Sequence, residues 1–450
     1  MTSEAKNNIC LAKSDKPRVV VIGAGFAGVH FTKAMSKAPV QVVILDKNNY
    51  HQFQPLLYQV ATSGLEPDSI TFPIRKVLAG AKNTSFRMAD VQRIDRENNR
   101  LITHTGMVDY DFLVIATGSV SNYYGNQAFE KYGVGLKTIN DALNIRSLIL
   151  QNFERAANSC DPEEKDMLTN VAIVGGGPAG VEMAGALAEF KRFVLPKDYP
   201  EFDKDNMKIY LIQASGELLQ TMSEKAKKRT VKDLEKMGVE VIFNVRVQNY
   251  DGETVDLGDK GTLKAATLVW TAGVKGTYPE GIPEEAKIGG GRIFVDDELR
   301  VKGTINIYAI GDIAGMISDD LPRGHPMVAQ AAMQEGIHLA KNINNKLKGK
   351  QTKSFIYKDK GSMATIGKKR AVADIGNSFI GGFFAWILWS TIHLLFIIGF
   401  KNKFLVGLNW GMNYITYDKG NRLIIRKYKR DLPGQKIYDR DIKPEEVFSD

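Results

Sequence analysis

The sequence predicts an α/β protein with two parallel-sheet domains of one kind and a separate aromatic segment near the C-terminal end. Three observations support this prediction. A glycine-rich turn at 23–28 follows an apolar strand, a turn at 175–180 repeats the glycine spacing, and residues 379–400 carry no formal charge. A strand, a G-x-G-x-x-G turn and a helix, in this order, are typical of a Rossmann-like dinucleotide-binding domain. The repeat predicts two such domains, the second inserted in the first.

The first turn joins an apolar strand at 19–22 to a predicted helix at 29–37. In this motif the first glycine permits a tight turn, the second lets the backbone approach a pyrophosphate, and the third allows close helix packing. The three glycines are Gly23, Gly25 and Gly28. The next strand, 40–45, ends in Asp46, where a carboxylate would meet the hydroxyl pair of a ribose. Lys47 beside it is either a phosphate contact or a solvated side chain.

Two further strands continue the first domain. Residues 86–100 alternate as one strand with Val91 and Ile94 directed inward. A buried strand at 110–115 then ends in a turn of small residues, which would let the chain pass beside a bound dinucleotide. That turn consists of Ala116, Thr117 and Gly118.

The second turn repeats the whole unit. A strand at 170–174 precedes it, a helix at 181–192 follows it, and the return strand at 207–212 ends in Gln213 rather than in an acid. A later apolar strand ends in a small-residue turn at Gly273. The glycines of the repeat are Gly175, Gly177 and Gly180. Two such sites on one chain predict two dinucleotides, a tightly held flavin and a nicotinamide that binds and leaves.

The chain then returns to the first domain with strands at 291–296 and 305–312. Asp312 ends a buried strand beside a glycine, where a carboxylate can accept hydrogen bonds from the polyol of a flavin. An Asx turn or a helix cap is the alternative role for this side chain.

A predicted helix at 326–335 carries two glutamines on one face. Gln330 and Gln334 stand at i, i+4 among alanines and methionines, Ala329 included. Such a face can pack closely on a flat ring system, and solvated glutamines are the alternative.

Composition narrows the function classes. The two cysteines, Cys10 and Cys160, are too few and too far apart for a C-x-x-C redox pair, and the sequence predicts no metal site. A formal net charge of +9 suits an anionic membrane surface, while no compact basic-aromatic module supports nucleic-acid binding. Residues 1–17 are polar and lack the apolar core of a signal peptide, so we expect a disordered lead and a cytoplasmic protein.

The uncharged segment 379–400 predicts contact with a membrane. It contains six large aromatic residues and is followed at once by Lys401 and Lys403. Paired glycines and His393 argue against a simple span, so a helical hairpin lying in one leaflet is favoured. A buried core helix and a true transmembrane span stay open as alternatives.

These residues resemble the type II NADH dehydrogenases, a family of single-chain, non-proton-pumping NADH:quinone oxidoreductases. The resemblance covers roughly 18–430 and rests on both glycine turns, the loop 53–58, the strand 308–312, the helix 329–334 and the aromatic tail. The glycine turns are shared by all flavoproteins with two dinucleotide sites, whereas the glutamine helix and the tail are more particular.

The resemblance implies an enzyme that passes a hydride from NADH to non-covalent FAD and then two electrons to a membrane quinone. It places Glu182 near the nicotinamide as a catalytic residue, and Gln330 and Gln334 on the quinone side of the flavin. Glu182 also falls in the first predicted turn of its helix, where the dipole would stabilise a carboxylate in any case. The cofactor-binding residues implied for both dinucleotides are Gly23, Gly25, Gly28, Asp46, Lys47, Val91, Thr117, Gly118, Gly175, Gly177, Gly180, Glu182, Gln213, Gly273, Asp312, Ala329 and Gln330.

The expected organisation follows from these assignments. We expect a lead at 1–17, an FAD-binding domain at 18–120 and 290–350, an NADH-binding domain at 121–289 and a membrane-anchoring domain at 351–450. The protein would lie on the cytoplasmic face of the membrane as a peripheral enzyme, with a homodimer left open. Because Gln213 is uncharged, NADPH is expected as a secondary donor. A soluble NAD(P)H-dependent reductase of a small electron-transfer protein, and a non-enzymatic flavoprotein, are the alternatives.

Overall fold

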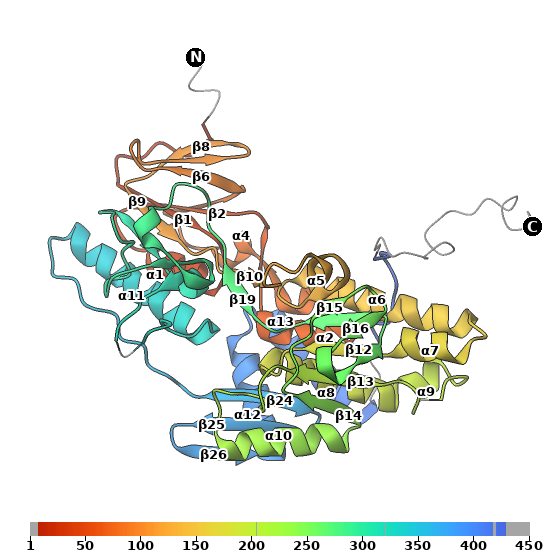
Figure 1. The fold of residues 1–450 in the computed structure, drawn as a ribbon. Coiled ribbons are helices and arrows are strands. Elements are labelled where there is room, and N and C mark those ends of the chain that lie inside the picture. The colour runs from red at the N-terminus through yellow and green to blue at the C-terminus, as the bar shows by residue number, and fades with distance from the viewer. Residues whose placement is uncertain (1–7, 204, 320, 417–419, 429–450) are drawn as a thin grey trace, which may run out of the picture. The chain divides into compact units, whose positions relative to one another are not determined.

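The structure is a computed structural model that describes residues 8–203, 205–319, 321–416 and 420–428. The chain divides into two compact units (Figure 1). Unit 1 comprises the described residues up to Phe53 together with Thr71–Val120 and Val274–Lys360. Unit 2 comprises Gln54–Ile70, Ser121–Gly273 and the described residues from Gly361 onward. The second unit is thus inserted in the first, as the sequence predicted.

The limits of these units differ from the expected domains in several places, and the domain expected at 351–450 is not a separate unit, because unit 1 ends at Lys360 and the described residues from Gly361 belong to unit 2. Residues 274–289 belong to unit 1, where the amide of Ile94 donates to the carbonyl oxygen of Glu280 at 2.8 Å. Residues 54–70 belong to unit 2, because α2 (Leu57–Ala61) packs against helices of that unit. Both attachments are long-range, and neither leaves a periodic signal in the local sequence.

Unit 1 is built on a parallel sheet, in which the described strands take the order β22-β9-β1-β2-β5. These strands are β1 (Arg18–Ile22), β2 (Gln41–Asp46), β5 (Thr84–Met88), β9 (Phe112–Ile115) and β22 (Ile307–Ala309). Val20 of the central strand lies opposite Val43 on one side and Leu113 on the other. All three side chains are fully buried, as expected for a strand covered on both faces.

Two helices of unit 1 cross closely beside this sheet. They are α1 (Phe26–Ala34) and α11 (Ala329–Leu347), which lie side by side in Figure 1. A Cβ atom at Gly336 would lie only 2.5 Å from the carbonyl oxygen of Ala27, so the approach requires glycine. The sequence placed these helices at 29–37 and 326–335. The first instead begins within the glycine turn, and the second continues to Leu347.

The expected single strand at 86–100 is two strands in the structure, which corrects the prediction. After β5 ends, the chain leaves the parallel sheet and forms an antiparallel sheet. Its strands are β6 (Val91–Asp95), β7 (Arg100–Thr103) and β8 (Gly106–Asp109). Ile94 is buried as expected, Val91 is only half-buried, and the prediction of one continuous strand was wrong. Alternation shows which face of a strand is buried and not which sheet it joins.

The remaining short elements of unit 1 connect these layers, and β10 ends at the border with unit 2. They are β3 (Tyr50–Gln52), β4 (Thr71–Pro73), α4 (Ile74–Val77), β10 (Ser119–Ser121), β19 (Val274–Gly276), β20 (Lys287–Ile288), β21 (Arg292–Phe294) and β23 (Ala314–Gly315).

Unit 2 repeats the parallel sheet, with the described strands in the order β11-β18-β12-β13-β14. They are β11 (Val134–Gly135), β12 (Val171–Val174), β13 (Ile209–Gln213), β14 (Val239–Phe243) and β18 (Thr267–Trp270). Besides α2, the helices of this unit before its C-terminal part are α3 (Pro67–Ile70), α5 (Gln127–Tyr132), α6 (Ile139–Asn158), α7 (Pro162–Thr169), α8 (Pro178–Phe193), α9 (Leu195–Asp198) and α10 (Glu224–Lys236). Thr138 and Asp141 form a capping box that starts α6, and Ser223 caps α10. The internal repeat predicted from the two glycine turns is therefore confirmed as a repeat of sheets.

A small antiparallel sheet extends the core of unit 2. It comprises β15 (Asn249–Tyr250), β16 (Thr254–Asp256) and β17 (Thr262–Lys264). Nearby, Phe129 stacks on Trp270 with ring centroids 4.6 Å apart, and Tyr250 is fully buried in the same cluster. Aromatic packing of this kind anchors the border strands of the sheet.

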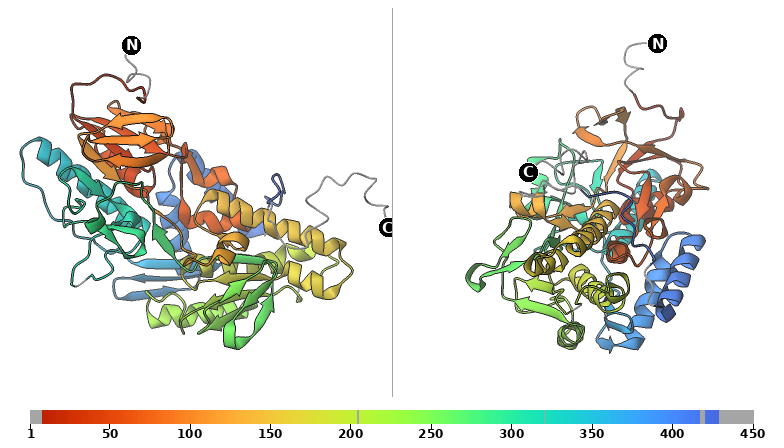
Figure 2. Two further views of the ribbon diagram at one scale, coloured as in Figure 1. Left: turned by 45° about the horizontal axis from the view of Figure 1, so that its top comes forward. Right: turned by 90° about the vertical axis from the view of Figure 1, so that its right-hand side faces the viewer.

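The C-terminal part of unit 2 begins with an antiparallel meander and ends in two helices that lie side by side (Figure 2). These elements are β24 (Ser362–Gly367), β25 (Arg370–Ile375), β26 (Ser378–Gly381), α12 (Phe383–Phe396) and α13 (Phe400–Thr416). A Cβ atom at Gly185 would lie 1.9 Å from the carbonyl oxygen of Ile366, so α8 packs directly on the backbone of β24. The meander thus holds the final helices against the dinucleotide-type sheet of this unit.

The segment 379–400 is not one continuous helix. Its first residues belong to β26, and α12 begins only after Gly382, whose φ of +75° turns the chain. Helix α12 has two faces, since Ala385 and Trp389 are buried while Phe384 is 75% exposed. Within the described residues, no helix combines the length and the apolar character needed to cross a membrane.

Candidate functional site

The two glycine turns have the same backbone geometry. Gly23 and Gly175 open the turns with φ of +103° and +114°. A Cβ atom at Gly28 would lie 1.9 Å from the carbonyl oxygen of Gly23, and one at Gly180 would lie 1.9 Å from that of Gly175. The first and third glycines are therefore required by the fold of each turn itself.

The middle glycine of each turn faces open space. Gly25 and Gly177 precede the first residues of α1 and α8, and no described atom lies within 4 Å of a Cβ atom built at either position. No side chain in the described chain caps the start of either helix. The free amides and the positive end of each helix are thus exposed where a phosphate would bind. This geometry fits the pyrophosphates of two dinucleotides.

Each glycine turn is held in place by the last side chain of a neighbouring strand, Asp46 of β2 in unit 1 and Gln213 of β13 in unit 2. Asp46 Oδ2 accepts a hydrogen bond from the amide of Ala24 at 2.7 Å, and its Oδ1 accepts one from Asn48 at 2.7 Å. In the second turn, Gln213 Oε1 accepts from the amide of Gly176 at 2.8 Å. Burial raises the pKa of Asp46, although the two backbone donors oppose this. Asp46 and Gln213 are therefore equivalent in structure as well as in sequence.

Asp312 is half-buried and lies in a polar cluster of unit 1. Ser119 Oγ donates to Asp312 Oδ2 at 2.5 Å, and the neighbouring amide of Gly311 donates to Glu335 Oε2 at 2.5 Å. Burial raises the pKa of Glu335 to about 8. Sequence reasoning missed Glu335, which stands one residue beyond Gln334 on a helix whose apolar neighbours gave no sign of a buried acid.

The other predicted residues of unit 1 lie on separate elements. Lys47 is exposed after β2, and Thr117 Oγ1 donates to the carbonyl oxygen of Thr277 at 2.6 Å. Gly118 has a φ of +73° in the small-residue turn. In unit 2, the φ of Gly273 is +157°, and a Cβ atom there would lie 2.4 Å from the hydroxyl of Tyr124. At Gly118 and Gly273, the backbone conformation itself therefore requires glycine.

The side chains of Gln330 and Gln334 form hydrogen bonds with the segment 358–360. Gln330 Oε1 accepts from the amide of Lys360 at 3.0 Å. Gln334 accepts from the amide of Lys358 at 3.1 Å and donates to its carbonyl oxygen at 2.9 Å. Both glutamines share one helix face, as predicted. Their partners are backbone groups of this segment and, for Gln330 Nε2, also Asp359 Oδ1 at 3.3 Å.

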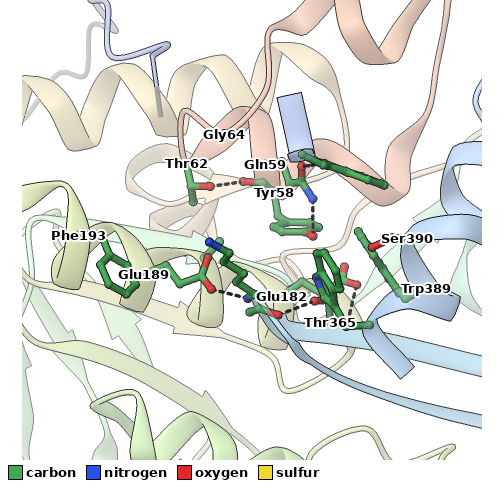
Figure 3. A pocket seen from close by; sticks show the side chains of 15 residues that line it. Tyr58, Gln59, Thr62, Gly64, Glu182, Glu189, Phe193, Thr365, Trp389 and Ser390 are labelled. Atoms are coloured by element: carbon green, nitrogen blue, oxygen red, sulfur yellow. Dashed lines mark hydrogen bonds between the residues drawn. The ribbon is translucent and has the colours of Figure 1, made fainter. Parts of the chain in front are cut away.

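A cavity of about 110 Å³ opens in unit 2 above α8 and β24 (Figure 3). It is mostly aromatic and apolar, with carboxylate, amide and hydroxyl groups on its walls. We call it the aromatic cavity; its principal lining residues are Tyr58, Gln59, Glu182, Thr365, Trp389 and Trp410. Apolar pockets with a few polar groups are the usual form of small-molecule sites.

Two acids line the aromatic cavity, Glu182 and Glu189, and of these Glu182 is the buried one. It is only 7% exposed, and the amide of Thr365 donates to its Oε1 at 3.3 Å, as Figure 3 shows. Burial raises its pKa to about 8, and the amide opposes this only in part. Because α8 begins at Pro178, Glu182 lies in the second turn of the helix and not in the first. The expected stabilisation of its charge by the helix dipole is therefore wrong.

Aromatic rings and amides complete the cavity from distant parts of the sequence. Trp410 Nε1 donates to Gln59 Oε1 at 2.8 Å, and Gln59 Nε2 donates to the hydroxyl of Tyr58 at 2.8 Å. Trp389 lies 5.5 Å from Trp410 between ring centroids and stacks on His393 at 4.2 Å. Because these residues come from three separate segments of the chain, no local sequence pattern assigned them to a site.

The second dinucleotide turn and the buried acid of the cavity share one helix. Gly177 precedes the first residue of α8, and Glu182 lies one turn further along it. Both groups therefore keep a fixed spacing within unit 2. Among the residues that the structure describes, no group of three or more histidine, cysteine, aspartate or glutamate side chains is arranged to hold a metal ion.

Models of two known protein families match most of this chain. Residues 17–336 match the pyridine nucleotide-disulphide oxidoreductases, and residues 360–416 match the NDH2 C-terminal domain. The type II NADH:quinone oxidoreductase Ndh of Mycobacterium tuberculosis is 35% identical over 422 residues, covering 90% of each chain. The type II NADH:quinone oxidoreductase of Staphylococcus aureus is 31% identical over 82% of this chain and 92% of that protein.

Solved structures support the same fold. The structure of NDH2 from Plasmodium falciparum in complex with NADH aligns with a TM-score of 0.81, over 91% of this chain and all of that chain, at 23% identity. The sulfide:quinone oxidoreductase of Aquifex aeolicus aligns with a TM-score of 0.66 over 84% of this chain and 90% of that chain, at 19% identity. With the family matches and the sequence identities above, the chain belongs to the type II NADH:quinone oxidoreductases of the pyridine nucleotide-disulphide oxidoreductase family.

Proposed function

We propose that the protein oxidises NADH and reduces a membrane quinone through bound FAD, without pumping protons. The observation that carries this proposal is the arrangement of two groups along α8. Its open N-terminus suits the pyrophosphate of NADH, and Glu182, one turn later, places a buried carboxyl group in an aromatic cavity. The same helix thus contributes to the binding site of the electron donor and to a cavity that suits a quinone ring.

FAD would be held non-covalently by unit 1. Gly25 leaves room for its pyrophosphate at the start of α1. Bound FAD would supply the two-electron relay between the nicotinamide and the quinone. Asp46 fixes the turn and would meet the adenosine ribose, while Asp312 would accept from the ribityl hydroxyls. The other residues that would contact it are Gly23, Gly28, Lys47, Val91, Thr117, Gly118, Ala329 and Gln330.

NADH would bind unit 2 at the second glycine turn. The start of α8 at Gly177 would face the pyrophosphate, with Gly175, Gly180 and Gly273 shaping the backbone around it. Gln213 keeps the turn in place without adding a negative charge beside the ribose. NADPH would therefore serve as a secondary donor.

The aromatic cavity would hold the quinone ring. The hydrogen-bonded chain of Trp410, Gln59 and Tyr58 would orient it, and the indole of Trp389 would pack on it. With a pKa of about 8, Glu182 is protonated near neutral pH and would donate a proton as the quinone is reduced. Gln330 and Gln334 would act in unit 1 by positioning the segment 358–360.

Exposed apolar side chains on the last two helices support attachment to a membrane. Phe384 and Leu395 of α12 are 75% and 65% exposed, and Phe404 of α13 is 60% exposed. Side chains of this size on two adjoining helices suit insertion into one leaflet, on the cytoplasmic face. A soluble reductase would have no need for them.

Light scattering in detergent would separate a monomer from a homodimer.

Anaerobic stopped-flow mixing tests the function. The purified protein should show a flavin spectrum, bleach when mixed with NADH, and regain its absorbance when a short-chain quinone is added. Bleaching without reoxidation by quinone would point to another acceptor. A protein without bound flavin, or one that NADH leaves oxidised, would overturn the proposal.

A further inference from the structure

A second cavity in unit 2 is strongly basic. Its volume is about 420 Å³, and it is formed by the end of α8, by α10, by the turn between β24 and β25 and by the start of α12. We call it the basic cavity; its cationic side chains are Arg192, Arg229, Lys368, Lys369 and Arg370. Cations from separate segments of the chain converge here on one hollow.

Nearby acids offset only part of this charge. Glu189 lines the cavity, and its carboxylate accepts the backbone amide of Lys368. Asp233, which is buried, pairs with Arg229 Nε at 2.6 Å. The lining of the cavity contains five cationic side chains and one acidic side chain, so positive charge predominates in it. An anion would be attracted to it.

The first turn of α12 adds hydrogen-bond donors to the same cavity. Gly382 and Phe383 line it, and within the described chain no side chain caps this helix and no acid stands in its first turn. The free amides and the positive end of the dipole therefore favour an anion as well. A Cβ atom at Gly382 would lie 3.5 Å from Arg229 Nη2, so the guanidinium group lies close to the start of this helix.

The apolar surroundings point to a lipid as the source of that anion. Phe383 at the cavity edge is 42% exposed and the adjoining Phe384 is 75% exposed. Aromatic side chains of this kind lie at the level of the headgroups, where phosphates are within reach of lysine and arginine. We infer that the basic cavity binds the phosphodiester headgroup of an anionic membrane lipid. The inference rests on the membrane attachment proposed above.

The two cavities share a wall. Glu189, Phe193 and Lys368 line both the aromatic and the basic cavity. A lipid headgroup in the basic cavity would thus lie directly beside the place proposed for the quinone. Its acyl chains would border the entry to that place.

Vesicle flotation of the full-length, FAD-loaded protein tests the inference. The vesicles are phosphatidylcholine alone or phosphatidylcholine with phosphatidylglycerol, at physiological ionic strength. Arg192→Gln with Arg370→Gln should lose about tenfold or more of the binding gained from phosphatidylglycerol. The matched control, Lys225→Gln with Lys228→Gln, removes the same charge from exposed positions of α10 and should lose less than about threefold.

Several outcomes would overturn the inference. Equal losses in both double variants would indicate diffuse attraction, and vesicle binding indifferent to phosphatidylglycerol would exclude an anionic lipid. Displacement by inorganic phosphate at matched ionic strength would assign the cavity to free phosphate. Should the arginine variant fold poorly, Lys369→Asn replaces it, because asparagine accepts the φ of +67° found there. Turnover of NADH with a water-soluble quinone in detergent, measured on the same samples, tests the proposed function separately.

Discussion

Gln213 accepts a hydrogen bond from the amide of Gly176 at the point where, in the other unit, Asp46 accepts one from Ala24. Gln213 Nε2 also donates to Ser215 Oγ at 2.7 Å. The glutamine therefore has a structural task, holding the turn beneath the proposed pyrophosphate site, in addition to any contact with the ribose. It performs this task without the negative charge by which such folds usually reject a 2′-phosphate.

Replacement of Gln213 should sharpen the choice of donor. In Gln213→Glu, the carboxylate still accepts from Gly176 and adds repulsion toward the extra phosphate of NADPH. We expect kcat/KM for NADPH to fall by about tenfold or more, with less than about a threefold change for NADH. Gln248→Glu makes the same chemical change on an exposed loop of unit 2 and should alter neither value. A wild-type enzyme inert toward NADPH would show that other residues enforce the choice.

In the first glycine turn, one glycine is required by the fold and another is required by the ligand. Gly28→Ala places a methyl group 1.9 Å from the carbonyl oxygen of Gly23, so thermal stability should fall sharply. Gly25→Ala meets no described atom within 4 Å, and the folded protein should persist with weaker FAD binding. Melting temperature and flavin content of both variants measure this. Full flavin content in Gly25→Ala would contradict the placement of the pyrophosphate.

Burial of Glu335 should make stability depend on pH. Its pKa is raised from an ordinary 4.5 to about 8, so the native protein binds this proton more tightly than the unfolded chain does. The contribution of Glu335 to stability is full below about pH 4.5 and declines towards pH 8, by at most about 1.4 kcal/mol per pH unit. Glu335→Gln keeps an acceptor for Gly311 and should flatten this decline. Urea unfolding across this pH range, with the exposed Glu97→Gln as control, measures it.

The parts that could be predicted from the sequence are those that a short segment determines alone. The strand before Gly23 and that before Gly175 are continuous apolar runs, and each turn constrains its own backbone. The repeat and the insertion followed from such local patterns. Glu182 entered only through the family resemblance.

The parts that could not be predicted depend on distant partners. Gln330 and Gln334 have the expected spacing, but nothing near them reveals that the backbone at 358–360 takes up their hydrogen bonds. The aromatic cavity needs Tyr58 and Trp410, which are far apart in the chain. Likewise, burial of Glu335 is visible only once α1 covers its helix.

Membrane attachment can be tested without removing the final helices. Truncation after Gly376 would also delete Trp389 and Trp410 from the aromatic cavity, so it would not isolate anchoring. Phe384→Ser with Leu395→Ser changes only side chains that are well exposed. This variant should leave the membrane fraction more readily while reducing a water-soluble quinone normally, as fractionation and activity assays would show. Wild-type protein that fractionates as soluble without salt or detergent would exclude the anchor.

The buried acid of the aromatic cavity should control quinone reduction and not flavin reduction. Glu182→Gln removes the proton that the carboxyl group holds below about pH 8. Quinone reduction should therefore slow by about a hundredfold near neutral pH. In the wild type this step should fall as pH rises through about 8, and the variant should lack that inflection. Stopped-flow reduction of the flavin by NADH should be nearly unchanged.

Glu189→Gln is the matched control for this prediction, because Glu189 lines the same cavity and its replacement keeps an acceptor for the amide of Lys368. If both variants slow quinone reduction equally, the effect belongs to the charge of the cavity and not to a proton held at Glu182. Equal slowing of both half-reactions in Glu182→Gln would indicate general damage to unit 2. Only selective loss of the quinone step, together with loss of the inflection near pH 8, assigns the proton to this carboxyl group.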